Sequence, residues 1–248
     1  MITRSDDYVE YCRETAKHAR DPHDLALRGR EKKDVTRLLH QQIADAVELH
    51  SGDDVVDIGC GDGTMLRIAD AAGARSAVGL LATDEEVAVL RRLGLNAKQG
   101  LADELPLPDS SASIVVCNSV LLVVPREKIP TSLREIHRVA KPGARIFLGE
   151  IPYEEQHDPT PQFATRRELL AYLYRKHGLR TWFGMLRRMA YRQVSGKPAL
   201  VNSGTAISFW ATPGEFIAMT HAAGLDLVRH WQCWQYPTRN NYLFRKPE

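Results

Sequence analysis

The chain has 248 residues, of which 44% are hydrophobic and 26% are charged, and its formal net charge is +2 at pH 7. This length and apolar content predict a soluble globular protein with a sizeable core, and they favour one elaborated domain over two independent ones. The longest apolar stretch, residues 114–124, is interrupted by Asn118 and Ser119 and is too short to span a bilayer.

The N-terminus predicts no export. Its first residues are charged and contain no apolar core of a signal peptide. The four cysteines form no CxxC pair, and two of them fall in a predicted turn and a predicted core strand; they are Cys12, Cys60, Cys117 and Cys233. We therefore expect a cytoplasmic protein with reduced cysteines. The nine histidines lack the spacing of metal ligands, so no metal is predicted.

The predicted elements begin with a helix over residues 32–49. Its apolar stripe consists of Val35, Leu38, Leu39, Ile43 and Val47. From residue 53 to residue 150 the chain alternates apolar runs with amphipathic segments, a pattern typical of a parallel sheet covered on both faces. The predicted strands are 55–58, 76–81, 113–118 and 144–150, and the predicted helices are 65–72, 85–93 and 129–140. Two further strand-like segments flank the turn-rich residues 237–241 and predict an antiparallel pair.

The sharpest local motif is VVDIGCGDGT at residues 55–64, where a buried strand enters a turn containing Gly59, Gly61 and Gly63. Glycine permits positive φ and close approach of a ligand, and free amides at the following helix start favour polar or anionic groups. The spacing differs from GxGxxG, and no carboxylate lies about 20 residues further on, so a dinucleotide fingerprint is poorly met. By itself, the motif fits either a tight connection or a ligand-binding turn.

Four segments, in this order, resemble the class I S-adenosylmethionine-dependent methyltransferases, in particular the methyltransferase-11-like group. They are VVDIGCGDGT, GLADELPLPDSSASIVVCNSVL, LREIHRVAKPGARIFLGE and FWATPGEFIAMTHAAGL. The resemblance implies an α/β fold: a Rossmann-like, seven-stranded, mostly parallel sheet with helices on both faces. It divides the chain into a cofactor-binding core (1–152), an inserted basic helical cover (153–205), and a C-terminal helix and strand pair (206–248).

The resemblance also implies S-adenosylmethionine as cofactor. Asp57, Gly59, Gly61 and Gly63 would hold its methionine part, although Asp57 could instead only cap the turn. The resemblance further assigns four residues of three later segments to the cofactor site. These are Leu81, Leu101, Ala102 and Asn118.

Two of these positions depart from the family pattern. Relatives end the second strand with an acid that binds both ribose hydroxyls, and they place another acid beside the adenine amino group; here the two positions are Leu81 and Leu101. Losing two charge-assisted hydrogen bonds would weaken binding by roughly two to four powers of ten. Apolar walls and the Ala102 amide could recover part of this loss. Alternatively, a neighbouring acid could turn in; the candidates are Asp84, Glu85 and Asp103.

Residues 163–200 contain nine basic residues and one acid, Glu168, which gives this segment a charge of +8. Its apolar residues recur at helical spacing, which predicts two basic amphipathic helices broken near Gly178. The basic residues could form a solvated face, a lid for an anionic acceptor, or a peripheral membrane contact. Nucleic acid is not favoured, because the rest of the chain is acidic and lacks an RNA-binding pattern. The predicted substrate-binding residues are Arg166, Arg167, Arg187 and Arg188.

The leading hypothesis is S-adenosylmethionine-dependent methyl transfer to an anionic small-molecule or glycan-type acceptor. Such transfer needs an in-line approach, and a base only where the acceptor must lose a proton. The candidate bases are Glu150 and His157, which could instead be a structural hydrogen-bonding residue and a surface histidine. The contrary hypothesis is a non-catalytic, methyltransferase-like partner or scaffold subunit that has lost cofactor binding. The intact glycine turn supports the first hypothesis, and Leu81 and Leu101 support the second.

Overall fold

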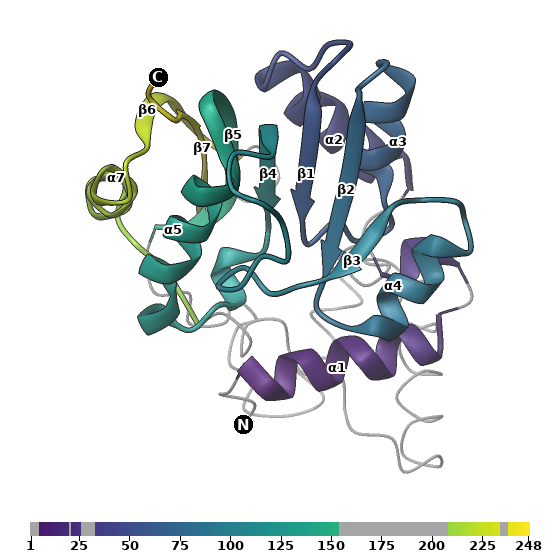
Figure 1. Cartoon of the computed structure of the whole chain (residues 1–248). Coiled ribbons are helices and arrows are strands. Elements are labelled where there is room, and N and C mark those ends of the chain that lie inside the picture. Colours follow the sequence, from purple (N-terminus) through teal and green to yellow (C-terminus); the bar gives the residue numbers. More distant parts are fainter. Residues whose placement is uncertain (1–4, 20, 26–32, 154–207, 234–237) are drawn as a thin grey trace, which may run out of the picture. The chain divides into compact units, whose positions relative to one another are not determined.

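Seven strands form one sheet at the centre of the structure. They are β1 (Asp54–Ile58), β2 (Ser76–Leu81), β3 (Ala97–Gln99), β4 (Ala112–Asn118), β5 (Ala140–Pro152), β6 (Asp226–Gln232) and β7 (Arg239–Arg245). The order across the sheet is β3-β2-β1-β4-β5-β7-β6, and β7 runs antiparallel to the other six strands (Figure 1). The computed structural model describes residues 5–19, 21–25, 33–153, 208–233 and 238–248. The predicted α/β sheet with a C-terminal antiparallel pair is confirmed.

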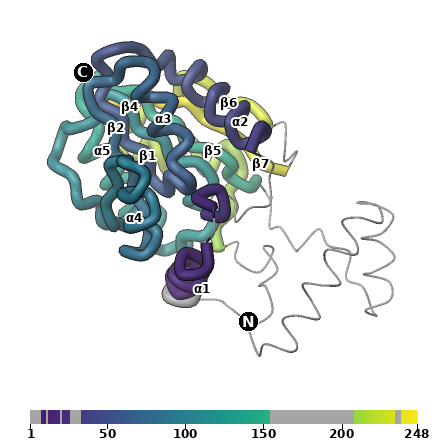
Figure 2. The backbone as a smooth tube through the Cα atoms, turned by 90° about the vertical axis from the view of Figure 1, so that its right-hand side faces the viewer, coloured from purple at the N-terminus to yellow at the C-terminus, as the bar shows by residue number. Residues whose placement is uncertain are grey.

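Helices cover both faces of the sheet. The helices are α1 (Ser5–Lys17), α2 (Lys33–Ala46), α3 (Thr64–Ala71), α4 (Asp84–Arg91), α5 (Ile129–Val139) and α7 (Pro213–Ala222), with the 3-10 helices η1 (Pro22–Asp24), η3 (Leu121–Val123) and η4 (Arg126–Lys128). Buried residues of α2, α3 and α4 form one core cluster, and those of α5 and α7 form the other. In Figure 2, α2 and α5 lie on opposite sides of the sheet. No helix in the described ranges is long and apolar enough to cross a membrane.

Strand β4 shows why the apolar runs predict a sheet buried on both faces. Successive side chains of a strand point to opposite faces. Ile114 and Val116 accordingly belong to the cluster with α2 and α3, and Val115 and Cys117 belong to the cluster with α5. All four side chains are fully buried, so neither face of this strand tolerates a polar residue.

Several predicted boundaries and one predicted core residue differ from the structure. Leu38 is 51% exposed, so its assignment to the core is wrong. The buried face of α2 follows Thr36, Leu39 and Ile43 at helical spacing, and Leu38 lies off that line. Strand β5 begins at Ala140, four residues before the predicted start, because Ala140 already pairs with Ala112 of β4. A register shift separates this pair from the next one, Ile114 with Arg145.

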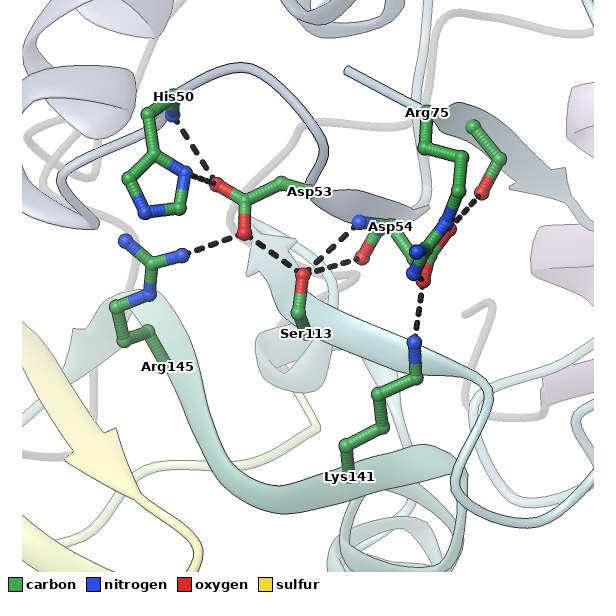
Figure 3. A network of polar contacts seen from close by, with 8 residues as sticks. His50, Asp53, Asp54, Arg75, Ser113, Lys141 and Arg145 are labelled. Carbon is green, nitrogen blue, oxygen red and sulfur yellow. Dashed lines mark hydrogen bonds and ion pairs between the residues drawn. The ribbon is translucent and has the colours of Figure 1, made fainter.

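Asp54, the first residue of β1, binds the amino ends of β2 and β5 (Figure 3). Its carboxylate accepts hydrogen bonds from Arg75, from the Ser76 hydroxyl at 2.8 Å and from Lys141. The Arg75 guanidinium is the main reason that the pKa of Asp54 lies well below its usual value, since it outweighs the opposing effect of burial. One carboxylate therefore ties three strands together at this end of the sheet.

The preceding residue, Asp53, makes a second set of contacts at the same end of the sheet (Figure 3). Its carboxylate accepts from the Ser113 hydroxyl of β4 at 2.8 Å and from Arg145 of β5 at 2.6 Å. The His50 amide donates to the other oxygen at 3.1 Å. Burial opposes ionisation of Asp53, but the His50 amide and the Ser113 hydroxyl help to hold its pKa below the usual value. Both aspartates lie at the start of β1, and the glycine turn follows the other end of this strand.

Asp54→Asn removes the charge that Arg75 and Lys141 share, and we expect it to lower the free energy of unfolding by about 1–3 kcal/mol at pH 7. Because the folded-state pKa of Asp54 lies below its unfolded value of about 3.9, the stabilisation is complete above about pH 4 and is lost as the pH falls further. Urea unfolding should therefore show a smaller difference from the parent protein at pH 3 than at pH 7. Asp70→Asn, on the exposed face of α3, is the control, and an equal loss at both pH values would contradict the assignment.

Candidate active site

The glycine turn follows β1 directly and contains left-handed backbone at all three predicted glycines. The φ angles of Gly59, Gly61 and Gly63 are 74°, 52° and 74°, values that side chains rarely adopt. The amides of Gly59 and Cys60 donate to the Leu80 carbonyl at 2.8 and 3.2 Å. The turn is therefore fastened to the carboxyl end of β2 by its own backbone.

Packing within the protein also requires two of these glycines. A Cβ atom on Gly59 would clash with Val120 Cγ2, and one on Gly63 would clash with Leu95 Cδ1. Both positions would therefore need glycine even if no ligand approached the turn. The glycines alone therefore do not distinguish a ligand-binding turn from a tight connection.

The buried carboxylate of Asp57 favours a ligand-binding turn. Its side chain is 3% exposed, and its Oδ2 atom has no hydrogen-bond partner among the described residues. Burial, together with the nearby charge of Asp62, raises the pKa of Asp57 to about 7. A buried carboxylate oxygen without a donor is costly in a folded protein. The arrangement fits a site that receives a cationic or hydrogen-bond-donating group from a ligand.

The carboxylate that caps α3 is Asp62, which sequence reasoning did not single out. Its Oδ1 atom accepts from the Thr64 amide at 2.9 Å and from the Thr64 hydroxyl at 2.6 Å. Its Oδ2 atom lies 3.1 Å from His23 Nδ1, so η1 contacts the turn. The sequence Asp-Gly-Thr carries a signal for this cap, because aspartate commonly binds an amide two residues further on.

A groove with a volume of about 760 Å³ lies on the side of the turn that faces α2 and η1. Its lining includes His23, Asp62, Thr64 and Arg67. Leu81, Leu101 and Ala102 are absent from this lining. The groove is therefore distinct from the surface that the tip of β2 provides.

The tip of β2 is apolar. Leu81 and Ala102 are each 5% exposed, and Leu101 is half-buried and bridges to Glu104. Leu81 belongs to the same core cluster as Val87 of α4. The structure thus places hydrocarbon, rather than carboxylate, at this side of the site.

Asn118 and Glu150 meet at the carboxyl ends of β4 and β5. The Asn118 amide lies 3.4 Å from Glu150 Oε1, and Arg239 of β7 donates to Glu150 Oε2 at 2.7 Å. Glu150 is fully buried, and both it and Ser119 have positive φ angles, 59° and 58°. Backbone strain of this kind concentrates at functional sites. No local pattern indicates a role for Arg239, because its partner is 89 residues away.

Nine predicted residues are gathered at the carboxyl ends of β1, β2, β4 and β5 or in the segments that follow these strands and β3. They are Asp57, Gly59, Gly61, Gly63, Leu81, Leu101, Ala102, Asn118 and Glu150. In open α/β sheets this edge is where ligands bind. The remaining predicted polar residues lie outside the described residues; they are His157, Arg166, Arg167, Arg187 and Arg188. Within the described ranges, no group of three or more His, Cys, Asp or Glu could hold a metal ion.

A family model described as a methyltransferase domain matches residues 56–148, which include the turn, the tip of β2 and all of β4. Residues 56–148 are therefore a methyltransferase domain, similar to those of S-adenosylmethionine-dependent methyltransferases. The cofactor implied by this methyltransferase domain is S-adenosylmethionine.

Curated relatives align mainly with the methyltransferase domain. The malonyl-(acyl-carrier protein) O-methyltransferase of Serratia marcescens is 30% identical over 128 residues, which cover 50% of this chain and 49% of that protein. The 24-methylenesterol C-methyltransferase 2 of Oryza sativa subsp. japonica is 29% identical over 126 residues, covering 48% of this chain and 34% of that protein. This chain therefore spans half or less of the length of these two relatives.

A solved structure supports the fold over a longer range. The complex of the Haloferax volcanii Trm112 methyltransferase activator with a methyltransferase matches with a TM-score of 0.58 at 18% identity. The match covers 93% of this chain and 100% of that chain. At this identity the likeness shows the fold alone.

Gly59→Ala tests how the turn of the methyltransferase domain is held. Gly94→Ala is a matched control, because Gly94 has φ 77° but open space around a Cβ atom. We expect the control to lose about 1–2 kcal/mol from left-handed strain alone, and Gly59→Ala to lose a further 1–3 kcal/mol from the clash with Val120. Chemical denaturation measures both variants. A pair of equal losses would contradict the close packing of Gly59 on Val120.

Proposed function

We propose that this protein transfers a methyl group from S-adenosylmethionine to an anionic small-molecule or glycan-type acceptor. The observation that carries the proposal is the buried Asp57 carboxylate, which has an unpartnered oxygen beside a turn with three left-handed glycines. A cationic ammonium group at this position would satisfy the orphaned oxygen. S-adenosylmethionine carries such a group at its methionine end.

The residues around the turn could also bind the carboxylate and the nucleoside end of the cofactor. Amides of the turn can meet the cofactor carboxylate, and the nucleoside end would lie at the apolar tip of β2, where Leu81 and Ala102 keep only 5% of their surface exposed. When bound, the cofactor supplies an electrophilic methyl group on a sulfonium. The protein contributes binding, orientation and exclusion of water around the reacting atoms.

Glu150 and His157 are the proposed bases for an acceptor that must lose a proton. Within the described segments, Glu150 Oε2 is held by Arg239, and Oε1 makes only the longer contact with Asn118. Oε1 is therefore the oxygen through which Glu150 would act on an acceptor. The same contacts also suit Glu150 to orienting the carboxyl ends of β4 and β5.

The acceptor class rests on charge. The segment 163–200 carries +8, and guanidinium groups bind phosphate and carboxylate in bidentate fashion. We assign Arg166, Arg167, Arg187 and Arg188 to acceptor binding. One relative is named for a malonyl group on an acyl-carrier protein and another for a sterol, so the relatives share no acceptor chemistry. The basic segment favours an anionic acceptor over a sterol, with peripheral membrane contact as the rival explanation.

A second candidate is a non-catalytic partner or scaffold subunit. Leu81 and Leu101 favour it, because they replace both carboxylates that would bind the nucleoside. The similar fold in a complex with a methyltransferase activator supports a protein partner for this chain. We further propose a cytoplasmic location, since Cys60 and Cys117 are buried thiols outside any disulfide, which suits a reducing compartment.

Titration calorimetry with S-adenosylmethionine tests the enzyme hypothesis through Asp57. In the free protein Asp57 titrates near pH 7, and a cationic ligand favours its ionised form, so binding should release a proton below that pH. We expect affinity to rise on the order of tenfold between pH 5.5 and 7.5. Asp57→Asn should bind about 10- to 100-fold more weakly at pH 7.5 and lose most of the pH dependence.

The same titration separates the two candidate functions. Absence of heat with millimolar S-adenosylmethionine and with S-adenosylhomocysteine would support the non-catalytic subunit. Binding that is indifferent to both pH and Asp57→Asn would show that the cofactor is held elsewhere.

Transfer of a labelled methyl group tests the acceptor class. We expect label in a phosphorylated sugar rather than in a sterol, and we expect Arg187→Glu combined with Arg188→Glu to lower that transfer by tenfold or more. Flotation with anionic vesicles is the parallel measurement. Vesicle binding without transfer to the phosphorylated sugar would favour membrane attachment as the role of the basic segment.

A further inference from the structure

The residue at the tip of β2 determines how the ribose of the cofactor can be bound. In the sheet register Ile58 pairs with Leu80, so Leu81 is level with Gly59, the first residue of the turn. In nucleoside-binding sheets of this kind, an acid near the end of the second strand accepts hydrogen bonds from ribose hydroxyls. Here that side chain is a buried leucine.

Three nearby acids are already occupied by other partners. Glu86 Oε2 accepts from the amide and hydroxyl of Thr83 at 3.2 and 2.9 Å, in the capping box of α4. Glu85 forms an ion pair with Arg13 of α1 at 3.4 Å. Asp103 forms one with Lys128 at 2.8 Å. In each of these acids, one oxygen is already held by a partner within the protein.

The main-chain carbonyls at the tip also accept hydrogen bonds from within the protein. The Leu80 carbonyl accepts from the amides of Gly59 and Cys60. The Leu81 carbonyl accepts from the Gly100 amide at 2.9 Å, and the Ala82 carbonyl accepts from Gln99 Nε2 at 3.2 Å. The remaining acid of this stretch is Asp84, which is exposed on the first turn of α4.

We infer that none of the described residues at the tip of β2 accepts a hydrogen bond from the ribose hydroxyls when this protein binds the nucleoside end of its cofactor. The inference rests on the proposed cofactor and adds a specificity to it: analogues that lack one ribose hydroxyl are accepted. A hydroxyl that donates to a carboxylate contributes about 10- to 100-fold in affinity. A hydroxyl with no acceptor on the protein keeps its water, so its removal changes affinity by less than about threefold.

The test compares the binding of S-adenosylhomocysteine with that of its 2′-deoxy and 3′-deoxy analogues, by calorimetry on the full chain. We expect the three dissociation constants to agree within threefold. A loss of tenfold or more for either analogue overturns the inference and leaves the proposed cofactor standing. If S-adenosylhomocysteine itself does not bind, the proposed function fails, and the inference fails with it.

Variants identify the residues responsible. Leu81→Asp restores an acceptor, and we expect it to tighten S-adenosylhomocysteine binding at least tenfold relative to the two deoxy analogues. Leu93→Asp, at a leucine that is 49% exposed, is the control and should leave the ratios unchanged. Since Leu81 is buried, the parent-protein comparison decides the inference even if Leu81→Asp fails to fold.

Asp84→Asn checks the exposed acid on the first turn of α4. We expect unchanged affinity for all three ligands. A tenfold loss confined to S-adenosylhomocysteine would assign the ribose to Asp84 and overturn the inference.

Discussion

The buried carboxylate of Asp57 is the constraint on which the account of the site depends. The end of β1 places it in the interior, where desolvation raises its pKa to about 7 and leaves one oxygen without a donor. A protein that needed only a tight turn would gain from an apolar residue there. The helix cap that could have explained an aspartate is instead made by Asp62. One carboxylate oxygen of Asp57 is therefore available to bind a ligand.

The two ends of β1 have opposite electrostatic designs. At its start, Asp53 and Asp54 are surrounded by donors, so both carboxylates are held in their ionised forms (Figure 3). At its far end, burial and the charge of Asp62 raise the pKa of Asp57, and no cation in the part of the chain that the structure describes offsets them. The start of β1, where the carboxylates are hydrogen-bonded within the protein, stabilises the sheet. The far end, where Asp57 has an oxygen without a donor, is available for binding. This division explains how five residues of one strand serve both stability and function.

The fold was predictable from the sequence because its signals are local. The apolar run of β4 and the glycines after β1 each determine their own conformation, and their order along the chain specifies a parallel sheet. Strand β3 is only three residues long and carries Lys98 and Gln99, so its weak alternation gave no prediction. Leu38 was misassigned because one helix offers two adjacent apolar lines, and only tertiary packing selects between them.

The candidate site was predictable only in part. Asp57 and the glycines lie in one motif, whereas Arg239 reaches Glu150 from 89 residues away and Val120 packs on Gly59 from another strand end. Such contacts depend on sheet order, which residue spacing does not encode. The most direct test of the central claim is a crystal structure of the full chain with S-adenosylhomocysteine. The account predicts the ligand ammonium within hydrogen-bonding distance of Asp57 and the adenosine against Leu81 and Ala102; a ligand bound away from Asp57, or a site filled by the protein's own side chains, would contradict it.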